Sequence, residues 1–484
     1  MLFNSYIFIL LFLPIAIIGY FILNHYKKNK IAEIYLLSMS LVFYAFFNVS
    51  YLPILIVSIL VNFLFYKYYL KNKKSKKKKI LLIFNLLLNL GLLVYFKYMN
   101  FFIDNINILF KKDIPLLTIF VPVGISFFTF QQIAFIIDSY KGDVSKYNFL
   151  DYATYISFFP TISSGPIAFH NEIIPQLNDK KRKKLNWENL SKGIYGFVLG
   201  LSKKVLIADI FGIVANYGFD NIEALNTTNA ILVMLSYTFQ IYFDFSGYSD
   251  MAIGIGKMFN IDLPVNFNSP YKALSIKDFW SRWHITLTRF FTKYIYIPLG
   301  GNRKGKTRTY INILIIFLIS GLWHGANWTF IIWGILHGIA SIIYRVFKKG
   351  FDKLNPVLNW FITFGFINIS WIFFRADSVR KALLFINRIF QFNFGAIADS
   401  IKNAFELPGF KFLLEKFSFL SYFPFLSLQL VFVITILLVL GSKNVQEKIE
   451  CFYPNIWKVI MTVLLLVWCI LSFSGISTFL YFNF

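Results

Sequence analysis

The feature that most constrains the fold is the recurrence of apolar runs long enough to cross a lipid bilayer. A helix needs about 20 apolar residues to span the hydrocarbon core. Lipid offers no hydrogen-bond partner to the backbone, so spans of this length are expected to be helical. The sequence therefore predicts an all-α polytopic membrane protein. The runs that approach or exceed the required length are 6–24, 31–48, 51–68, 80–96, 114–137, 193–217, 229–245, 311–347, 357–374, 424–441 and 456–474.

Composition favours one membrane-embedded domain over the whole chain. Of 484 residues 57% are hydrophobic and 20% aromatic, and no polar linker separates the apolar runs. We therefore expect a single domain, 1–484, with N-terminal helices in 1–119, a central part in 120–347 that carries the motifs, and further helices and a tail in 348–484. Pro160, Gly165 and Pro166 interrupt 149–168, which indicates a broken or re-entrant element.

The net charge of +25 is explained by the membrane rather than by nucleic acid. Lysines gather in short patches between apolar runs, and such patches are retained in the cytoplasm and attracted to anionic lipid. Counting spans from an N-terminus on the outer side places 25–30 and 71–79 in the cytoplasm and leaves 475–484 outside. Both termini are therefore expected outside. The patches are 27–30, 71–79, 180–184, 303–308 and 348–353.

Two familiar kinds of binding site are not expected. Cys451 and Cys469 form neither a disulfide framework nor a zinc-binding spacing, so we expect no metal site. The segment Gly300–Thr307 matches the phosphate-loop pattern. A true phosphate loop joins a strand to a soluble helix, whereas the residues that follow here are apolar and read as a span. We interpret this segment as a basic loop.

His324 is the strongest candidate for chemistry, because polar groups inside a bilayer are costly and histidine can exchange protons near neutral pH. From Arg308 to His324 the chain advances 16 residues, or about 24 Å as α-helix at 1.5 Å per residue. Gly321 and Gly325 permit close helix approach or a local break. Trp323 and Trp328 would supply rigid walls. We expect a functional imidazole here, with helix packing as the alternative.

Other polar groups leave alternatives open. His284 lies among tryptophans and arginines, which suits either an interfacial amphipathic segment or a site in which Arg282 or Arg289 holds an anionic group such as phosphate. Asp244 and Asp250 end an apolar run; they either orient the histidine, pair with arginines or mark the interface. For the other histidines we expect a structural role at His337, an interfacial position at His25 and contact with water at His170.

Several of these segments, taken in order, resemble the membrane-bound O-acyltransferase family, in particular its bacterial branch of alginate and peptidoglycan O-acetyltransferases. Any one segment alone would be weak evidence, whereas the series in unbroken order from about 120 to 345 is specific. The matching segments are Pro122–Gln131, Phe159–Pro166, Gln240–Asp250, Leu263–Phe267, Phe279–His284, Tyr296–Gly301 and Gly321–Trp328.

The resemblance implies a funnel of tilted helices around a membrane-embedded histidine, which maps to His324, with His284 as the second family histidine. It implies acetyl-CoA as a cytosolic donor substrate, with no permanently bound cofactor. It also implies an extracytoplasmic partner resembling SGNH hydrolases that completes transfer to a glycan. The branch often ends in an aromatic hexapeptide with a relay tyrosine, which maps to Tyr481; an interfacial anchor is the alternative. Around these groups we expect substrate contacts from Asn266, Arg282, Trp283, Trp323 and Asp244.

Two departures from the family pattern stand out. The family pattern has Arg-Asp-Tyr where this chain has Thr292-Lys293-Tyr294. A role for the aspartate of that pattern is therefore not assigned to this chain. Asn327 replaces a more usual alanine and offers a hydrogen bond near His324.

The sequence thus predicts a membrane O-acetyltransferase of the bacterial cytoplasmic membrane that modifies an extracytoplasmic polysaccharide, either an alginate-like exopolysaccharide or peptidoglycan. D-alanyl transfer to teichoic acid is the alternative within the family. A polysaccharide or lipid transporter is the alternative outside it, but it would favour internal repeats, which the sequence lacks.

Overall fold

The computed structural model describes residues 1–71, 77–406, 425–473 and 479–480. These residues form helices joined by short connections, with no strand among them, which confirms the all-α prediction. By length and composition, five of the described helical segments can cross a membrane, and these account for five of the predicted runs. They are Ile7–His25, Val49–Lys71, Lys77–Phe110, Trp328–Val346 and Pro356–Arg375.

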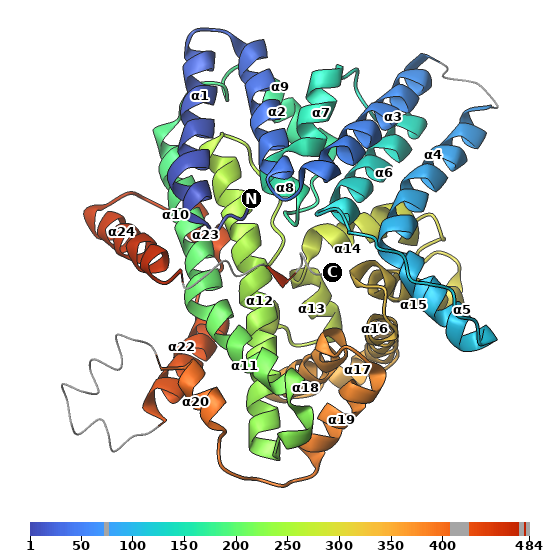
Figure 1. Ribbon diagram of the computed structural model, residues 1–484, viewed down its shortest axis with the longest axis vertical. Coiled ribbons are helices and arrows are strands. Elements are labelled where there is room, and N and C mark those ends of the chain that lie inside the picture. Colours follow the sequence, from blue (N-terminus) through green and yellow to red (C-terminus); the bar gives the residue numbers. More distant parts are fainter. Residues whose placement is uncertain (72–76, 407–424, 474–478, 481–484) are drawn as a thin grey trace.

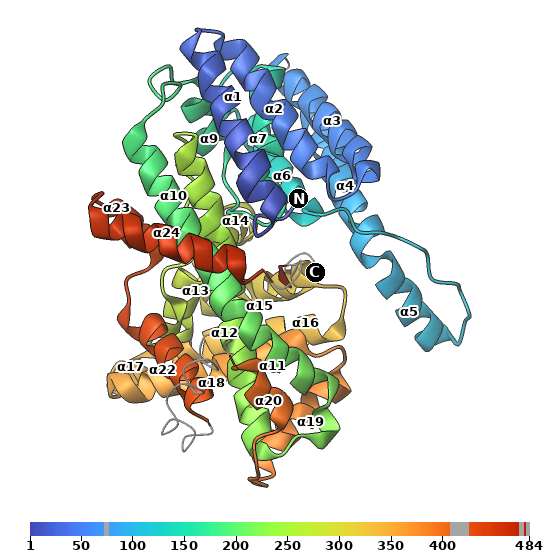
Figure 2. The ribbon, with the colours of Figure 1, turned by 60° about the vertical axis from the view of Figure 1, so that its left-hand side comes forward.

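The N-terminal helices stand side by side at the upper end of the molecule (Figure 1), where α3 and α4 both pack on α6. The α1–α2 connection, the facing ends of α3 and α4, and the connection before α10 all lie toward this end (Figures 1 and 2). Three of the five predicted basic patches, 27–30, 71–79 and 180–184, belong to these connections. The helices are η1 (Ile7–Phe12), α1 (Leu13–His25), α2 (Asn29–Ala45), α3 (Leu52–Lys71), α4 (Lys77–Leu93), η3 (Val94–Tyr98), α5 (Met99–Phe110) and α6 (Ile125–Lys141).

The predicted span 114–137 is wrong in its first half. Residues 112–122 form no helix, and α6 begins only at Ile125. Pro115 and Pro122 lack the backbone N–H that a helix interior needs, and Gly124 takes a left-handed φ of 73°. The prediction of a broken element over 149–168 is confirmed, since this segment holds α7 (Phe149–Ser157), α8 (Phe159–Ile162) and then irregular chain before α9 (His170–Asn178).

The centre of the molecule is a pair of long helices in close contact. The first is α10 (Trp187–Ser202), continued by η4 (Lys203–Ala208) and α11 (Asp209–Asp220); the second is α12 (Thr227–Met258). α12 has 32 residues and continues well past the predicted end of its run at 245. Glycines let α10 and α12 approach: a Cβ on Gly200 would lie 2.6 Å from the carbonyl oxygen of Gly247. Such contacts between backbones favour small residues.

Most of the remaining helices lie in the lower part of the molecule (Figures 1 and 2), whereas the last two helices of the described chain pack on α10. The predicted run 311–347 is two helices rather than one span, α15 and α16, with the break at 325–327. The helices are α13 (Ile276–Arg282), α14 (Ile285–Phe291), η7 (Thr292–Tyr296), α15 (Gly305–His324), α16 (Trp328–Val346), α17 (Lys348–Phe351), α18 (Pro356–Arg375), α19 (Val379–Phe390), α20 (Asp399–Ala404), α22 (Leu426–Gly441), α23 (Val445–Glu450) and α24 (Ile456–Leu471).

Glycines also set the contact between α15 and α16. A Cβ on Gly321 would lie 2.3 Å from the carbonyl oxygen of Phe330, and a Cβ on Gly334 would lie 2.3 Å from that of Phe317. Real Cβ atoms do not approach a carbonyl so closely. The two helices therefore touch through their backbones just before the break that ends α15.

We predict that Gly334→Ala destabilises the detergent-solubilised protein by about 1–3 kcal/mol, because the new methyl group must push α15 and α16 apart. Gly365→Ala is the matched control, since a Cβ at Gly365 of α18 meets nothing within 4 Å. Thermal unfolding followed by fluorescence measures both variants. Equal melting temperatures for the two variants would contradict the close glycine contact.

Candidate functional site

His324 is the last residue of α15 and is only 2% exposed. Its ring makes edge contacts with Trp333 and Phe374, at centroid distances of 5.1 and 5.0 Å. Trp333 comes from α16 and Phe374 from α18. Three helices thus enclose the imidazole in an aromatic cage at the point where α15 ends.

The break after His324 is held by specific hydrogen bonds. Gly325 is extended, and the side chain of Asn327 accepts a bond of 3.0 Å from the N–H of Thr329 to cap α16. At the end of α15, the ammonium of Lys97 donates to the carbonyls of Trp323 (2.5 Å) and His324 (3.2 Å). The Tyr98 hydroxyl donates to the carbonyl of Leu322 at 2.6 Å. These bonds satisfy carbonyls that a helix end leaves without partners.

Sequence analysis missed Lys97 and Tyr98. They belong to η3, the π-helical turn that joins α4 to α5. The one available signal was a lone lysine directly after the apolar run 80–96, since a charge inside a span generally has an assigned partner. The partner itself, more than 200 positions away along the chain, could not be read from local sequence.

His284 lies at the corner between α13 and α14, with no exposed surface and a left-handed φ of 43°. This backbone region is uncommon for residues other than glycine and is found at functional positions. The Nδ1 atom lies 3.0 Å from the Oδ1 atom of Asn266. That same oxygen accepts bonds from the N–H (3.3 Å) and hydroxyl (2.9 Å) of Thr286, which identifies it as an acceptor. Nδ1 therefore carries the proton, and the lone pair of the neutral ring is on Nε2.

Both histidines contact the same indole ring. The Trp323 centroid lies 4.9 Å from that of His324 and 5.8 Å from that of His284. Trp323 in turn stacks on Phe130 of α6 at 5.5 Å. The arrangement gathers two buried imidazoles in apolar walls built from distant parts of the chain. Two neutral imidazoles can exchange protons with a group that reaches them, and the surrounding aromatic rings exclude water.

The other histidines differ from these two. His337 has partners on both ring nitrogens: the Trp280 indole N–H donates to Nδ1 at 3.2 Å, and Nε2 lies 3.1 Å from the Ser370 hydroxyl. This pattern agrees with a structural role. His170 is 3% exposed and lies 3.4 Å from Asp138, so the expected contact with water is wrong. His25 is exposed at the end of α1.

Among the remaining predicted site residues, the two aspartates of α12 bind lysines rather than arginines. The Asp244 carboxylate lies 2.7 Å from the Lys204 ammonium, and Asp250 lies 2.6 Å from Lys203. Sequence analysis overlooked these lysines inside the apolar run 193–217. Asp244 thus faces η4, although the next residue on α12, Phe245, packs against the His284 ring at 4.8 Å.

Arg282 and Trp283 directly precede His284, at the end of α13. The Arg282 Nε atom donates to Asp278 at 2.7 Å within its own helix, so part of its capacity to bind an anion is already occupied. Trp283 is 1% exposed and packs against Trp371 of α18 at 5.0 Å. It forms part of the wall behind the histidines.

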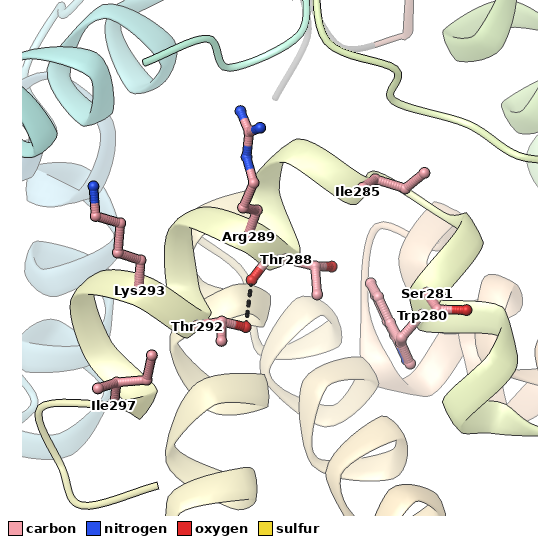
Figure 3. Close-up of a pocket in the computed structure, with 8 residues that line it drawn as sticks. All are labelled: Trp280, Ser281, Ile285, Thr288, Arg289, Thr292, Lys293 and Ile297. Atoms are coloured by element: carbon pink, nitrogen blue, oxygen red, sulfur yellow. Dashed lines mark hydrogen bonds between the residues drawn. The ribbon is translucent and has the colours of Figure 1, made fainter. Parts of the chain in front are cut away.

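A pocket of about 330 Å³ opens beside the corner between α13 and α14 (Figure 3). Arg289 and Lys293 extend from successive turns toward one side of it, and Trp280 stands at the other (Figure 3). Arg289 is paired with Glu172 at 2.5 and 2.8 Å, and Lys293 with Asp138 at 2.9 Å. The lining residues are Trp280, Ser281, Ile285, Thr288, Arg289, Thr292, Lys293 and Ile297.

Tyr481 lies outside the described residues. The two residues before it are described: Phe479 is 1% exposed, and the N–H of the half-buried Leu480 donates to Asp244 at 3.0 Å. Within the described part of the chain, no group of three or more His, Cys, Asp or Glu side chains is arranged to hold a metal ion.

Comparison with known proteins places these features in a family. The sequence model of the membrane-bound O-acyltransferase family matches residues 117–380. A peptidoglycan O-acetyltransferase of Helicobacter pylori is 41% identical, over 100% of this chain and 98% of that protein. A probable alginate O-acetylase of Pseudomonas putida is 38% identical over 81% of each chain. A teichoic acid D-alanyltransferase of Bacillus subtilis is 30% identical over 52% of this chain and 68% of its own length.

Proposed function

The chain belongs to the membrane-bound O-acyltransferase family, and we propose that it transfers an acetyl group from cytosolic acetyl-CoA for O-acetylation of an extracytoplasmic polysaccharide. Peptidoglycan is the first candidate acceptor, because similarity to a peptidoglycan O-acetyltransferase extends over the whole chain. An alginate-like exopolysaccharide is the second. The D-alanyltransferases match only about half of this chain, which disfavours that alternative, and membership of an enzyme family disfavours a transporter.

The observation that carries this proposal is the pair of buried histidines that both contact Trp323. In the mechanism, neutral His324 takes the proton of an acceptor hydroxyl as its oxygen attacks the thioester carbonyl carbon. The carbon–sulfur bond then breaks, and the leaving thiolate recovers the proton from the imidazolium. General base catalysis of this kind contributes about 10²–10⁴-fold to a rate. The aromatic walls keep water from competing with the hydroxyl.

His284, which contacts the same indole ring, is proposed to assist His324. Because Asn266 fixes the proton on Nδ1, the Nε2 lone pair can accept a hydrogen bond from an N–H or O–H group of a bound substrate other than the hydroxyl whose proton passes to His324. Asn266 is then a positioning residue for His284, and Trp323 and Trp283 shape the walls. Asp244 and Arg282, which we expected at the substrate, remain predictions in that role.

The donor is proposed to enter from the side that carries the basic connections at 27–30, 71–79 and 180–184, which would face the cytoplasm of a bacterial inner membrane. This assignment leaves both termini outside. The pocket at the corner between α13 and α14 contains Arg289 and Lys293, which would exchange Glu172 and Asp138 for the phosphates of acetyl-CoA. Tyr481 is proposed to carry the acetyl group to an extracytoplasmic partner resembling SGNH hydrolases, which completes transfer to the glycan.

We predict that His324→Ala lowers polymer acetylation at least about 100-fold, because the general base is lost. Base-labile acetate on the cell-wall polymer of a host that lacks its own enzyme measures the activity. His25→Ala, at an exposed position on α1, should acetylate normally. Normal acetylation by His324→Ala, at equal membrane content, would remove His324 from the mechanism.

Asn266→Leu should reduce the rate about tenfold or more, because the acceptor that fixes the His284 proton disappears and the wrong tautomer becomes accessible. Asn266→Asp keeps an acceptor at the same place and should recover much of the rate. Turnover of acetyl-CoA by purified protein measures both variants. If the two variants were equally active, the amide would have no role in setting the tautomer.

Tyr481→Phe removes only the hydroxyl oxygen that the relay requires. We expect polymer acetylation, measured as base-labile acetate, to fall to background. The amount of the protein in the membrane should be unchanged. Undiminished acetylation in this variant would leave the tyrosine without a part in transfer.

A further inference from the structure

Two adjacent lysines of η4 each form an ion pair with an aspartate of α12. The two pairs differ in how deeply they are buried. Lys203 pairs with Asp250, at 17% and 12% side-chain exposure. Lys204 pairs with Asp244, at 3% and 2%, and also lies 2.8 Å from Asp209. Desolvating a charge pair is expensive, so a buried pair is weak evidence for stability by itself. The more buried pair therefore calls for an explanation in terms of what else it contacts.

The additional contact is the segment 479–480. Lys204 stands over the Phe479 ring with its ammonium 4.9 Å from the centroid. Asp244 shares its oxygens between two partners: Oδ1 accepts from Lys204 at 2.7 Å, and Oδ2 accepts from the N–H of Leu480 at 3.0 Å. One ion pair thus binds both the ring and the backbone of two consecutive residues. Cation–π contacts and charge-assisted hydrogen bonds are strong when desolvated.

The rest of the binding surface comes from Tyr248, one turn further along α12. The Phe479 ring meets the Tyr248 ring edge-on at 4.7 Å. The Phe3 ring also stacks on the Tyr248 ring, with the centroids 4.8 Å apart. The N-terminal residues therefore help to build the same surface. Both ends of the described chain accordingly lie near the middle of the molecule (Figures 1 and 2).

We propose that Lys204, Asp244 and Tyr248 form a docking site for the chain's own segment 479–480, and that this docking positions the following residue, Tyr481, for the transfer step. Asp244 is then a positioning residue rather than a substrate ligand. The location fits this role, because Phe245, the neighbour of Asp244 on α12, contacts His284 at 4.8 Å, and Leu480 packs against the hydrophobic cluster that contains Trp323 and Trp333. The positioning of Tyr481 for transfer rests on the proposed function, whereas the docking of 479–480 does not.

The experiment measures docking by chemical accessibility, independently of activity. Leu480→Cys is introduced with Cys451→Ser, which removes the exposed native cysteine, while Cys469 stays buried. Maleimide modification of residue 480 in the full-length detergent-solubilised protein is followed by peptide mass spectrometry. The docking site is removed by the double substitution Lys204→Met and Asp244→Leu, which leaves neither partner of the pair as a lone buried charge. The matched control is Lys203→Met with Asp250→Leu, on the same two helices.

We expect residue 480 to react about tenfold or more faster in the Lys204/Asp244 double variant, because an undocked segment exposes its thiol, and to stay protected in the control. Polymer acetylation, measured without the cysteine substitutions, should fall at least about tenfold in the first variant and persist in the control. Continued protection of residue 480 in the Lys204/Asp244 variant would overturn the docking site. Faster labelling with full acetylation would overturn its role in transfer. Failure of the unsubstituted protein to acetylate would instead count against the proposed function alone.

Discussion

The site depends on how one broken helix satisfies its backbone inside the membrane protein. When α15 ends at His324, its last carbonyls lose their helical partners, and lipid supplies none. Lys97 and Tyr98 donate to these carbonyls, and Asn327 caps the start of α16. With the backbone satisfied, the chain can turn at depth and leave the imidazole at the end of a helix, among the rings of Trp333 and Phe374.

Close backbone contacts make this arrangement rigid. Gly321 and Gly334 bring α15 against α16, and the glycines of α10 and α12 do the same at the centre. Because such contacts leave no space for side chains, the helices cannot slide without losing them. The aromatic residues fill the remaining volume and hold both imidazoles against the Trp323 ring. Rigid placement of this kind is what a reaction between two bound substrates requires.

Much of this organisation was predictable from sequence, for identifiable reasons. The apolar runs indicated helices, and the glycines around His324 permitted either close helix approach or a local break, both of which the structure has. The functional role of His324 stays a prediction. The run 114–137 misled because hydropathy does not register the backbone effects of Pro115 and Pro122. Lys203 and Lys204 were overlooked inside an apolar run, since their partners Asp250 and Asp244 belong to another helix. The tautomer of His284 likewise depends on Asn266, a contact that only the fold creates.

The central claim is that a thioester reaches the imidazole of His324 within the membrane protein. The most direct measurement is a structure of the purified protein bound to a thioether analogue of acetyl-CoA that cannot be cleaved. We expect the analogue's acyl carbon beside His324 and Trp323, with its phosphates near Arg289 and Lys293. An analogue bound with its acyl end away from His324, and the cage of Trp333 and Phe374 closed around the ring, would contradict it.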